Sequence, residues 1–186
     1  MGLIQNVRRF MVVVIAFAAF SPLGASGAAT SSDDASPNPA RQNTFHRSQS
    51  AGYELGTLRI PAIDVYEVFR SGVSMSVIDQ GVAHWAGPSM PGGQGNVVLA
   101  GHRTTHSRPF HDLDRLRVGD LVFLTNGDGF EVIYRVADRF VVEPTDIWIT
   151  YDFDGPTVTM FACHPKGSAS QRIVVTAEMV AGRLIA

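Results

Sequence analysis

A series of short apolar runs, beginning at Tyr53, most tightly limits what this chain can fold into. The runs are rich in β-branched and aromatic residues, several alternate apolar with polar positions, and Gly, Pro, Asp or Asn separate them. This pattern predicts strands joined by turns. The sequence NGDG at 126–129, between two of the runs, is typical of a β-hairpin turn. The predicted strands are residues 53–60, 64–69, 96–101, 121–125, 130–142, 157–162 and 172–180.

Two segments interrupt the strands and are predicted to be short helices. Residues 74–82 begin with Ser74, a residue type that caps helix N-termini, and residues 108–116 have Pro109 near their start and Gly119 after their end. Seven or eight short strands with so few helices predict an all-β domain, a barrel or a sandwich, over residues 53–186.

The N-terminus has the order of a secretory signal. Arg8 and Arg9 precede eleven apolar residues, 10–20, and small residues follow. A membrane span needs about 20 apolar residues, so the shorter run favours cleavage, with an uncleaved anchor as the alternative. We therefore expect residues 1–25 to be a signal peptide or membrane anchor. The domain would then be exported, either held at the outer face of the membrane or secreted.

Residues 26–52 have a different composition from the rest of the chain. They are rich in Ser, Ala, Asn and Pro, and they have no hydrophobic period. Such a segment buries too little apolar surface to offset its ordering entropy, so we expect a disordered exported linker. The chain carries a formal net charge of -2, and its basic residues are scattered rather than clustered. Neutralising phosphates takes clustered Lys and Arg, so nucleic-acid binding is excluded.

Cys163 is the only cysteine, and an exported protein with one cysteine has no intramolecular disulfide partner for it. The thiol is then inert and buried, bridged to another molecule, or reactive. A nucleophilic thiol acts as the thiolate, which nearby cations favour. Arg172 opens the next predicted strand, so pairing of 157–163 with 172–180 would bring it near Cys163. His164 is a poor base for this thiol, because neighbouring residues on a strand point to opposite faces.

His102 directly follows a strand that reads as buried, a position from which it can project into a site. Histidine titrates near neutral pH and suits general acid–base chemistry. His106 and His111 follow at spacings of four and five, and with Cys163 they offer a possible metal set of three His and one Cys. Specific zinc spacings lie on a helix or a knuckle, and Pro109 interrupts any helix here. We therefore predict no metal and no cofactor.

Three separated segments, in order, resemble the sortase family. They are GTLRIPAIDV at 56–65, the block from Gly81 to Asp120, and TVTMFACHPKGSASQRIVV at 157–175. Within them, GHRTTH and CHPKGSASQR are most similar to class E sortases of GC-rich Gram-positive bacteria. The resemblance covers about residues 55–180. It implies a closed eight-stranded β-barrel with short helices and the activity of a cysteine transpeptidase.

The resemblance also implies a role for each of three residues. Cys163 would be the nucleophile that forms a thioacyl intermediate, and His102 the general acid that protonates the leaving amine. Arg172 would stabilise the bound signal and the oxyanion. Three further residues are candidates for substrate binding: Thr104, His106 and Ala162. The substrate would be a C-terminal L-P-x-T-G or L-A-x-T-G sorting signal, cut between Thr and Gly. The acyl group would pass to an amine of a cell-wall precursor or a pilin.

Ala162 departs from the family pattern T-L-x-T-C, which here reads Thr159-Met160-Phe161-Ala162-Cys163. Leu to Met conserves apolar volume and is mild. Alanine in place of threonine removes a hydroxyl beside the nucleophile. Where that hydroxyl contacts the signal or the oxyanion, its loss costs about 1–3 kcal/mol of transition-state stabilisation. We still expect activity, either slower or tuned to a different signal.

Two other functions fit parts of the sequence. An exported β-barrel binding or scaffold module with a structural cysteine predicts a buried Cys163 with no cation within reach. In an L,D-transpeptidase-like wall enzyme, a glycine directly precedes the nucleophile, and a histidine lies shortly upstream of it. Here Phe161-Ala162 precedes the cysteine and His102 lies about sixty residues away, so this alternative ranks lower.

Overall fold

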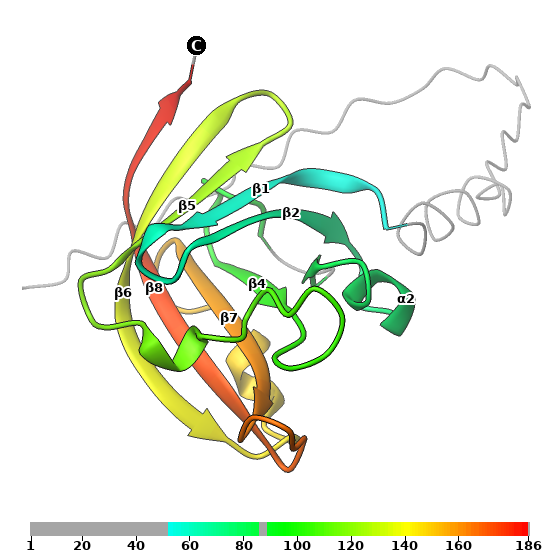
Figure 1. Cartoon of the computed structure of the whole chain (residues 1–186). Coiled ribbons are helices and arrows are strands. Elements are labelled where there is room, and N and C mark those ends of the chain that lie inside the picture. The colour runs from blue at the N-terminus through cyan, green and yellow to red at the C-terminus, as the bar shows by residue number, and fades with distance from the viewer. Residues whose placement is uncertain (1–51, 86–88, 186) are drawn as a thin grey trace, which may run out of the picture. The chain divides into compact units, whose positions relative to one another are not determined.

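Eight strands close into a barrel in the computed structural model of the chain, which describes residues 52–85 and 89–185 (Figure 1). The strands are β1 (Glu54–Ile60), β2 (Val65–Ser71), β3 (Val82–His84), β4 (Asn96–Ala100), β5 (Leu121–Asn126), β6 (Phe130–Val142), β7 (Thr157–His164) and β8 (Gln171–Leu184). The helices are η1 (Pro61–Ile63), α2 (Met75–Ile78), η2 (Leu113–Arg115) and η3 (Ile147–Thr150). The predicted signal or anchor at 1–25 and residues 26–51 of the predicted linker lie outside the described residues.

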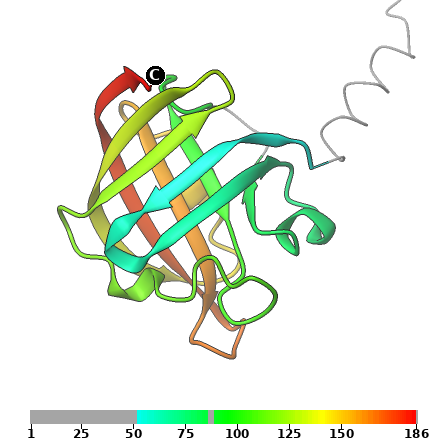
Figure 2. The same ribbon diagram turned by 45° about the horizontal axis from the view of Figure 1, so that its top comes forward.

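The strands follow one another around the barrel in the order β1, β2, β3, β4, β7, β8, β6, β5, and β5 pairs with β1 to close it (Figure 2). Most neighbours are antiparallel, whereas β2–β3 and β4–β7 are parallel. Closure leaves no open sheet edge, which is how antiparallel folds avoid edge-to-edge association. None of the helices within residues 52–85 and 89–185 is long and apolar enough to cross a membrane.

The seven predicted strands are all present, with ends that differ by a few residues, and the barrel is the architecture that the resemblance implies. The hairpin prediction is also confirmed, because β5 and β6 pair antiparallel across the turn at 126–129. Strand β3 has only three residues, all of them buried, which is too short to give a period of two.

The two predicted helices are shorter than expected. Residues 74–82 form one turn of α-helix, α2, and Val82 already belongs to β3. Ser74 precedes this helix without a side-chain capping bond. Residues 108–116 contain only the 3-10 turn η2, because Arg108 adopts a left-handed backbone conformation (φ 52°) and Pro109 follows it.

The barrel interior holds the hydrophobic core. Every residue of β4 is buried, as expected for a strand between two others with both faces covered. The largest buried side chains come from all around the barrel: Leu58, Ile60, Phe69, Leu99, Phe110, Leu113, Leu116, Leu124, Tyr134 and Met160. Phe110 and Leu113 lie in the segment after β4, so the core anchors this segment beside the carboxyl ends of β4 and β7.

Candidate active site

Cys163 and Arg172 lie directly opposite each other on the antiparallel pair β7–β8. Directly opposed residues of such a pair point to the same face of the sheet, with their Cβ atoms about 4.5–5.5 Å apart. The pairing predicted from the sequence is therefore confirmed, and a permanent cation faces the thiol across one strand spacing. Cys163 is partly exposed, not buried.

The parallel pairing of β4 with β7 brings His102 to the same place. Ala100 is in register with Phe161, and the Gly101 N–H donates to the Phe161 carbonyl at 3.3 Å. His102 and Cys163 are each two residues further along, so the chain leaves β4 beside the end of β7. A Cβ on Gly101 would lie 2.8 Å from the Phe110 ring, which accounts for a glycine before the histidine.

Cys163, His102 and Arg172 line one cavity of about 180 Å³. Its other lining residues are mostly apolar: Met75, Ile78, Ala100, Gly101, Phe161 and Ala162. All three predicted catalytic residues therefore meet at a single apolar pocket, although two of them are separated by some sixty residues of sequence.

Asp79 is a further residue of this site. It is the C-terminal cap of α2, and its Oδ1 lies 2.8 Å from Nε2 of His102. A neutral imidazole that donates Nε2–H to this carboxylate carries its lone pair on Nδ1. Asp79 thereby orients the His102 ring and selects the tautomer in which Nδ1 exchanges protons, as the acid does in a nucleophile–His–acid triad.

His106 lies next to His102 but is not among the residues that line the pocket. The two rings stack with their centroids 4.7 Å apart and an interplanar angle of 19°, and Nε2 of His106 is 3.5 Å from Asp79 Oδ1. Thr104 is exposed in the same loop and is not among the residues that line the pocket. Substrate contact by either residue stays a prediction.

Ala162 lines the pocket but also belongs to the core. Its exposed fraction is 2%, because side chains along β7 alternate and that of Ala162 points inward between those of Phe161 and Cys163. A threonine here would place its methyl group and hydroxyl against packed neighbours. Substrate contact by Ala162 also stays a prediction.

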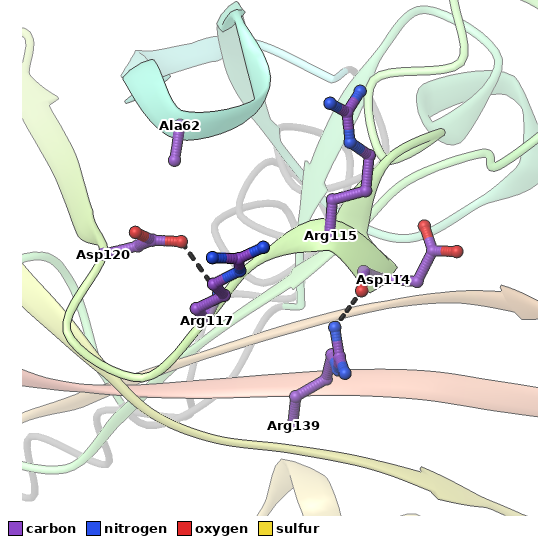
Figure 3. Close-up of a pocket in the computed structure, with 6 residues that line it drawn as sticks. All are labelled: Ala62, Asp114, Arg115, Arg117, Asp120 and Arg139. Carbon is purple, nitrogen blue, oxygen red and sulfur yellow. Dashed lines mark hydrogen bonds between the residues drawn. The ribbon is translucent and has the colours of Figure 1, made fainter.

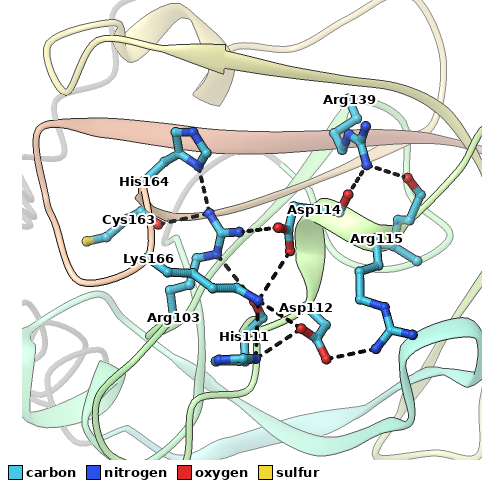
Figure 4. A network of polar contacts seen from close by, with 10 residues as sticks. Arg103, His111, Asp112, Asp114, Arg115, Arg139, Cys163, His164 and Lys166 are labelled. Atoms are coloured by element: carbon cyan, nitrogen blue, oxygen red, sulfur yellow. Dashed lines mark hydrogen bonds and ion pairs between the residues drawn. The ribbon is translucent and has the colours of Figure 1, made fainter.

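Arg103 is a buried cation behind the nucleophile (Figure 4). Its guanidinium donates from Nη1 to His164 Nδ1 at 2.8 Å and to the Cys163 carbonyl at 3.4 Å. It also donates from Nε to the His111 carbonyl at 3.3 Å, and it pairs with Asp114 at 2.9 Å. Because Arg103 directly follows His102, these bonds hold the chain beside His102 against the backbone of Cys163.

His164 lies on the opposite face of β7 from Cys163, as predicted, and it accepts a hydrogen bond from Arg103 (Figure 4). A second contact joins the same two segments nearer the surface, where Lys166 Nζ donates to Asp112 Oδ1 at 2.9 Å. Chiefly because of this bond, the pKa of Asp112 is lowered to about 2. His111 contacts Asp112 at 3.0 Å, so it belongs to this pair and not to the His102 cluster.

Arg172 is held by the loop between β7 and β8. Its Nη1 donates to the carbonyls of Ala169 at 2.9 Å and Gln171 at 2.8 Å. A guanidinium has five N–H groups. Within the described residues, no partner is seen for those on Nη2 and Nε. These donors are available to an oxygen of a bound molecule.

An aromatic surface continues from the pocket. A second small cavity, of about 60 Å³, also borders Phe161 and Arg172 and reaches Trp85. Phe161 and Trp85 lie 6.3 Å apart between ring centroids. The two cavities share one face of β7, so an extended chain could pass from Cys163 along this surface.

A larger cavity elsewhere lacks the chemistry of an active site. It has about 540 Å³ and is lined by Ala62, Asp114, Arg115, Arg117, Asp120 and Arg139 (Figure 3). Its side chains are charged but include neither a nucleophile nor a histidine. Arg139 donates to the backbone carbonyls of Asp114 and Leu116, so part of its cationic charge holds the η2 segment in place.

The sequence pattern does not single out Asp79 or Arg103. Asp79 reaches His102 from a segment 23 residues upstream, and no local spacing predicts that contact. Arg103 follows His102 directly and is one of many arginines in the chain. The residues that follow Arg103, Thr104 to Arg108, are polar, so nothing in the local sequence marks Arg103 as buried.

Comparisons with known proteins agree with this geometry. Residues 58–180 match the family model described as the sortase domain. Sortase SrtE1 of Streptomyces coelicolor is 31% identical over an alignment of 148 residues, and the match covers 71% of this chain and 42% of SrtE1. Sortase D of Bacillus subtilis is 28% identical over an alignment of 167 residues, and the match covers 88% of this chain and 79% of that protein.

A solved structure agrees as well. Sortase E1 from Streptomyces coelicolor, determined with a tripeptide in its active site, superposes with a TM-score of 0.66 at 30% identity. The match covers 71% of this chain and 91% of that structure. The chain spans less than half the length of SrtE1, whereas it covers 91% of the solved structure. By its matched domain, its barrel and its similarity to class E members, this chain belongs to the sortase family.

Proposed function

We propose that this chain is a cysteine transpeptidase that cuts a C-terminal sorting signal and transfers the acyl part to an amine. The observation that carries the proposal is the shared pocket of Cys163, His102 and Arg172. A thiol, an oriented imidazole and a permanent cation are the groups that acyl transfer through a thioester requires.

In the first half-reaction, the Cys163 thiolate attacks the carbonyl carbon of the scissile Thr–Gly bond while His102 holds the proton that the thiol has lost. The C–S bond forms, and the carbonyl electron pair moves onto oxygen. Collapse of this tetrahedral intermediate breaks the C–N bond, and His102 gives its proton to the leaving amine. In the second half-reaction, an acceptor amine attacks the thioester and loses a proton to His102, and the thiolate is released.

Arg172 has the donors for the oxyanion. Two carbonyls hold its Nη1, so the rest of the planar guanidinium is oriented before substrate arrives. Preorganised donors stabilise developing charge better than water, which must reorient first. Because arginine stays charged at every accessible pH, this contribution does not titrate.

The pocket suits a signal with apolar residues upstream of the Thr whose bond is cut. The apolar wall formed by Met75, Ile78 and Phe161 borders the nucleophile, and the aromatic surface toward Trp85 extends it. An L-P-x-T-G or L-A-x-T-G peptide fits this order of apolar and small residues. The acceptor would be an amine of a cell-wall precursor or of a pilin subunit. The site would act outside the cell, held by the N-terminal segment or released from it.

A direct test incubates the full-length chain with candidate sorting peptides and an amine, and identifies products by mass spectrometry. We expect a product that joins the peptide, cut after Thr, to the amine. We expect no product from Cys163→Ala, His102→Ala or Arg172→Ala, with an Arg135→Ala chain as the matched control. Hydrolysis elsewhere in the peptide, or a product that persists in Cys163→Ala, would refute the proposal.

A structural cysteine in a binding module has less support. That alternative requires a buried Cys163 without a cation in reach, whereas Cys163 is partly exposed and Arg172 lies opposite. Alkylation by iodoacetamide near neutral pH separates the two functions. We expect modification at Cys163 in the folded chain, altered in rate by His102→Ala and Arg172→Ala. A thiol that is inert in the folded chain would favour the module.

A further inference from the structure

We propose that Asp79, His102 and His106 form a binding site for a transition-metal ion of the zinc class, and that the bound ion switches the transpeptidase off. The inhibitory part rests on the proposed function, whereas the binding part does not. The set that the sequence analysis considered and rejected contained His102, His106, His111 and Cys163. It lacked Asp79, whose contact with the two histidines is tertiary.

The three donor atoms converge. One ligand atom from each residue lies within 4.8 Å of the others. Nε2 of His102 is 2.8 Å from Asp79 Oδ1, and Nε2 of His106 is 3.5 Å from the same oxygen. Ligands bound at about 2.0–2.2 Å in a tetrahedron are separated by roughly 3.3–3.6 Å. To surround one ion, the donors would draw together and the two imidazoles, which stack at an interplanar angle of 19°, would rotate until both lone pairs meet the ion.

The donor set selects the class of ion. Two imidazoles and one carboxylate suit zinc and its neighbours, whereas calcium and magnesium take oxygen ligands. Three protein ligands with a fourth position left to water is a common zinc arrangement. The solvent-exposed fractions of Asp79 and His106, 38% and 47%, give an ion a path of entry.

The backbone at His106 supports a specific arrangement of the two rings. His106 has a φ of 54°, in the left-handed region that residues other than glycine rarely adopt. This conformation accompanies the stacking of its ring on that of His102, with both Nε2 atoms directed at one carboxylate oxygen. Backbone conformations of this kind concentrate at functional sites.

A metal ion at this site would stop His102 from carrying protons during catalysis. An ion bound through Nε2 of His102 occupies the lone pair of that nitrogen, so the one proton of the neutral ring moves from Nε2 to Nδ1. Nδ1 then has no lone pair with which to accept the thiol proton, so His102 no longer acts as the base. Because ligand protons compete with the ion, binding weakens as the pH falls.

The test first measures binding alone. Zn²⁺ is titrated into the full-length chain in competition with a chromophoric chelator. Every chain in this titration carries Cys163→Ala, so that the thiol cannot act as a ligand. We expect one ion per chain, with affinity weakened at least about tenfold by His106→Gln and by Asp79→Asn. His111→Gln is the matched control, because the exposed fraction of His111 is a similar 41%. Equal affinity in all four chains, or no binding, overturns the proposal.

The second measurement uses the chain with Cys163 intact and follows transpeptidation against Zn²⁺ concentration. We expect inhibition that a chelator reverses, and a half-inhibiting concentration at least about tenfold higher for His106→Gln than for His111→Gln, each relative to its own zinc-free rate. Binding without inhibition overturns the switch. A chain inactive toward every peptide would count against the proposed function, and the binding titration would still decide the metal site.

Discussion

Replacing Arg103 by methionine is the most informative test of how the site is held together. Methionine preserves much of the apolar stem but removes the guanidinium. That group is buried, with 1% of its side chain exposed, and it serves four partners: His164, Asp114 and the carbonyls of Cys163 and His111.

The size of the effect follows from what the partners lose. Removing one member of a buried ion pair costs about 3–5 kcal/mol when the other is left unsolvated. The Asp114 side chain is 40% exposed and recovers part of its hydration, so this share falls below that range. The three remaining hydrogen bonds add about 1 kcal/mol each, less what water restores. We expect a loss of about 3 kcal/mol, or about 10 °C in Tm for a domain of this size.

Urea unfolding followed by tryptophan fluorescence measures this loss, with Arg135→Met as the control. Arg135 is exposed, and none of the described residues bonds to its side chain, so its replacement should change stability by less than about 0.5 kcal/mol. We also expect kcat to fall in Arg103→Met at temperatures where it stays folded, because the links to Cys163 and His164 are gone. Equal stability of the two variants would refute the role given to Arg103.

Three further predictions concern single residues. Asp79→Asn should lower kcat by about 100-fold or more with little change in KM, because an amide that donates to Nε2 selects the wrong tautomer of His102; an unchanged kcat would contradict this role. Ala162→Thr should raise the transpeptidation rate but lower the unfolding free energy by about 1–3 kcal/mol, since it adds atoms to a packed site. A stability loss without a gain in rate would make Ala162 a packing residue. Burial lowers the pKa of His84, which its hydrogen bond to the Ser89 carbonyl only partly offsets. The unfolded chain therefore takes up a proton near pH 6.5 that the folded chain resists, and stability should fall below that pH. In urea unfolding, His84→Gln should lose less stability than the unsubstituted chain between pH 7.5 and 5.5, and equal losses would refute the assignment.

The strands and the Cys163–Arg172 pair could be predicted from the sequence for the same reason. Both follow from short-range order, since strands have a period of two and consecutive strands tend to pair. Placing His102 needed the family resemblance, because β4 and β7 are parallel neighbours separated by two other strands in the chain. Composition and spacing carry no signal for such a pairing.

Asp79 and Arg103 were beyond sequence reasoning for a physical reason. The helix predicted over 74–82 would have continued past Asp79, whereas α2 ends there and turns the carboxylate toward His102. The burial of Arg103 depends on partners from the chain after β4 and from β7, which meet only once the barrel has closed. Both residues act through tertiary contacts that local propensity does not encode.

Trapping the acyl-enzyme is the most direct measurement of the central claim, that Cys163, His102 and Arg172 form one acyl-transfer site. The full-length chain is mixed with a sorting peptide without an acceptor amine, quenched in acid, and digested for mass spectrometry. We expect a thioester at Cys163 that carries the peptide up to its Thr, and we expect Arg172→Ala to reduce its amount greatly. This thioester should disappear when an amine is added. A peptide adduct on another residue, or cleavage of the peptide with Cys163 replaced by alanine, would contradict the assignment of this site.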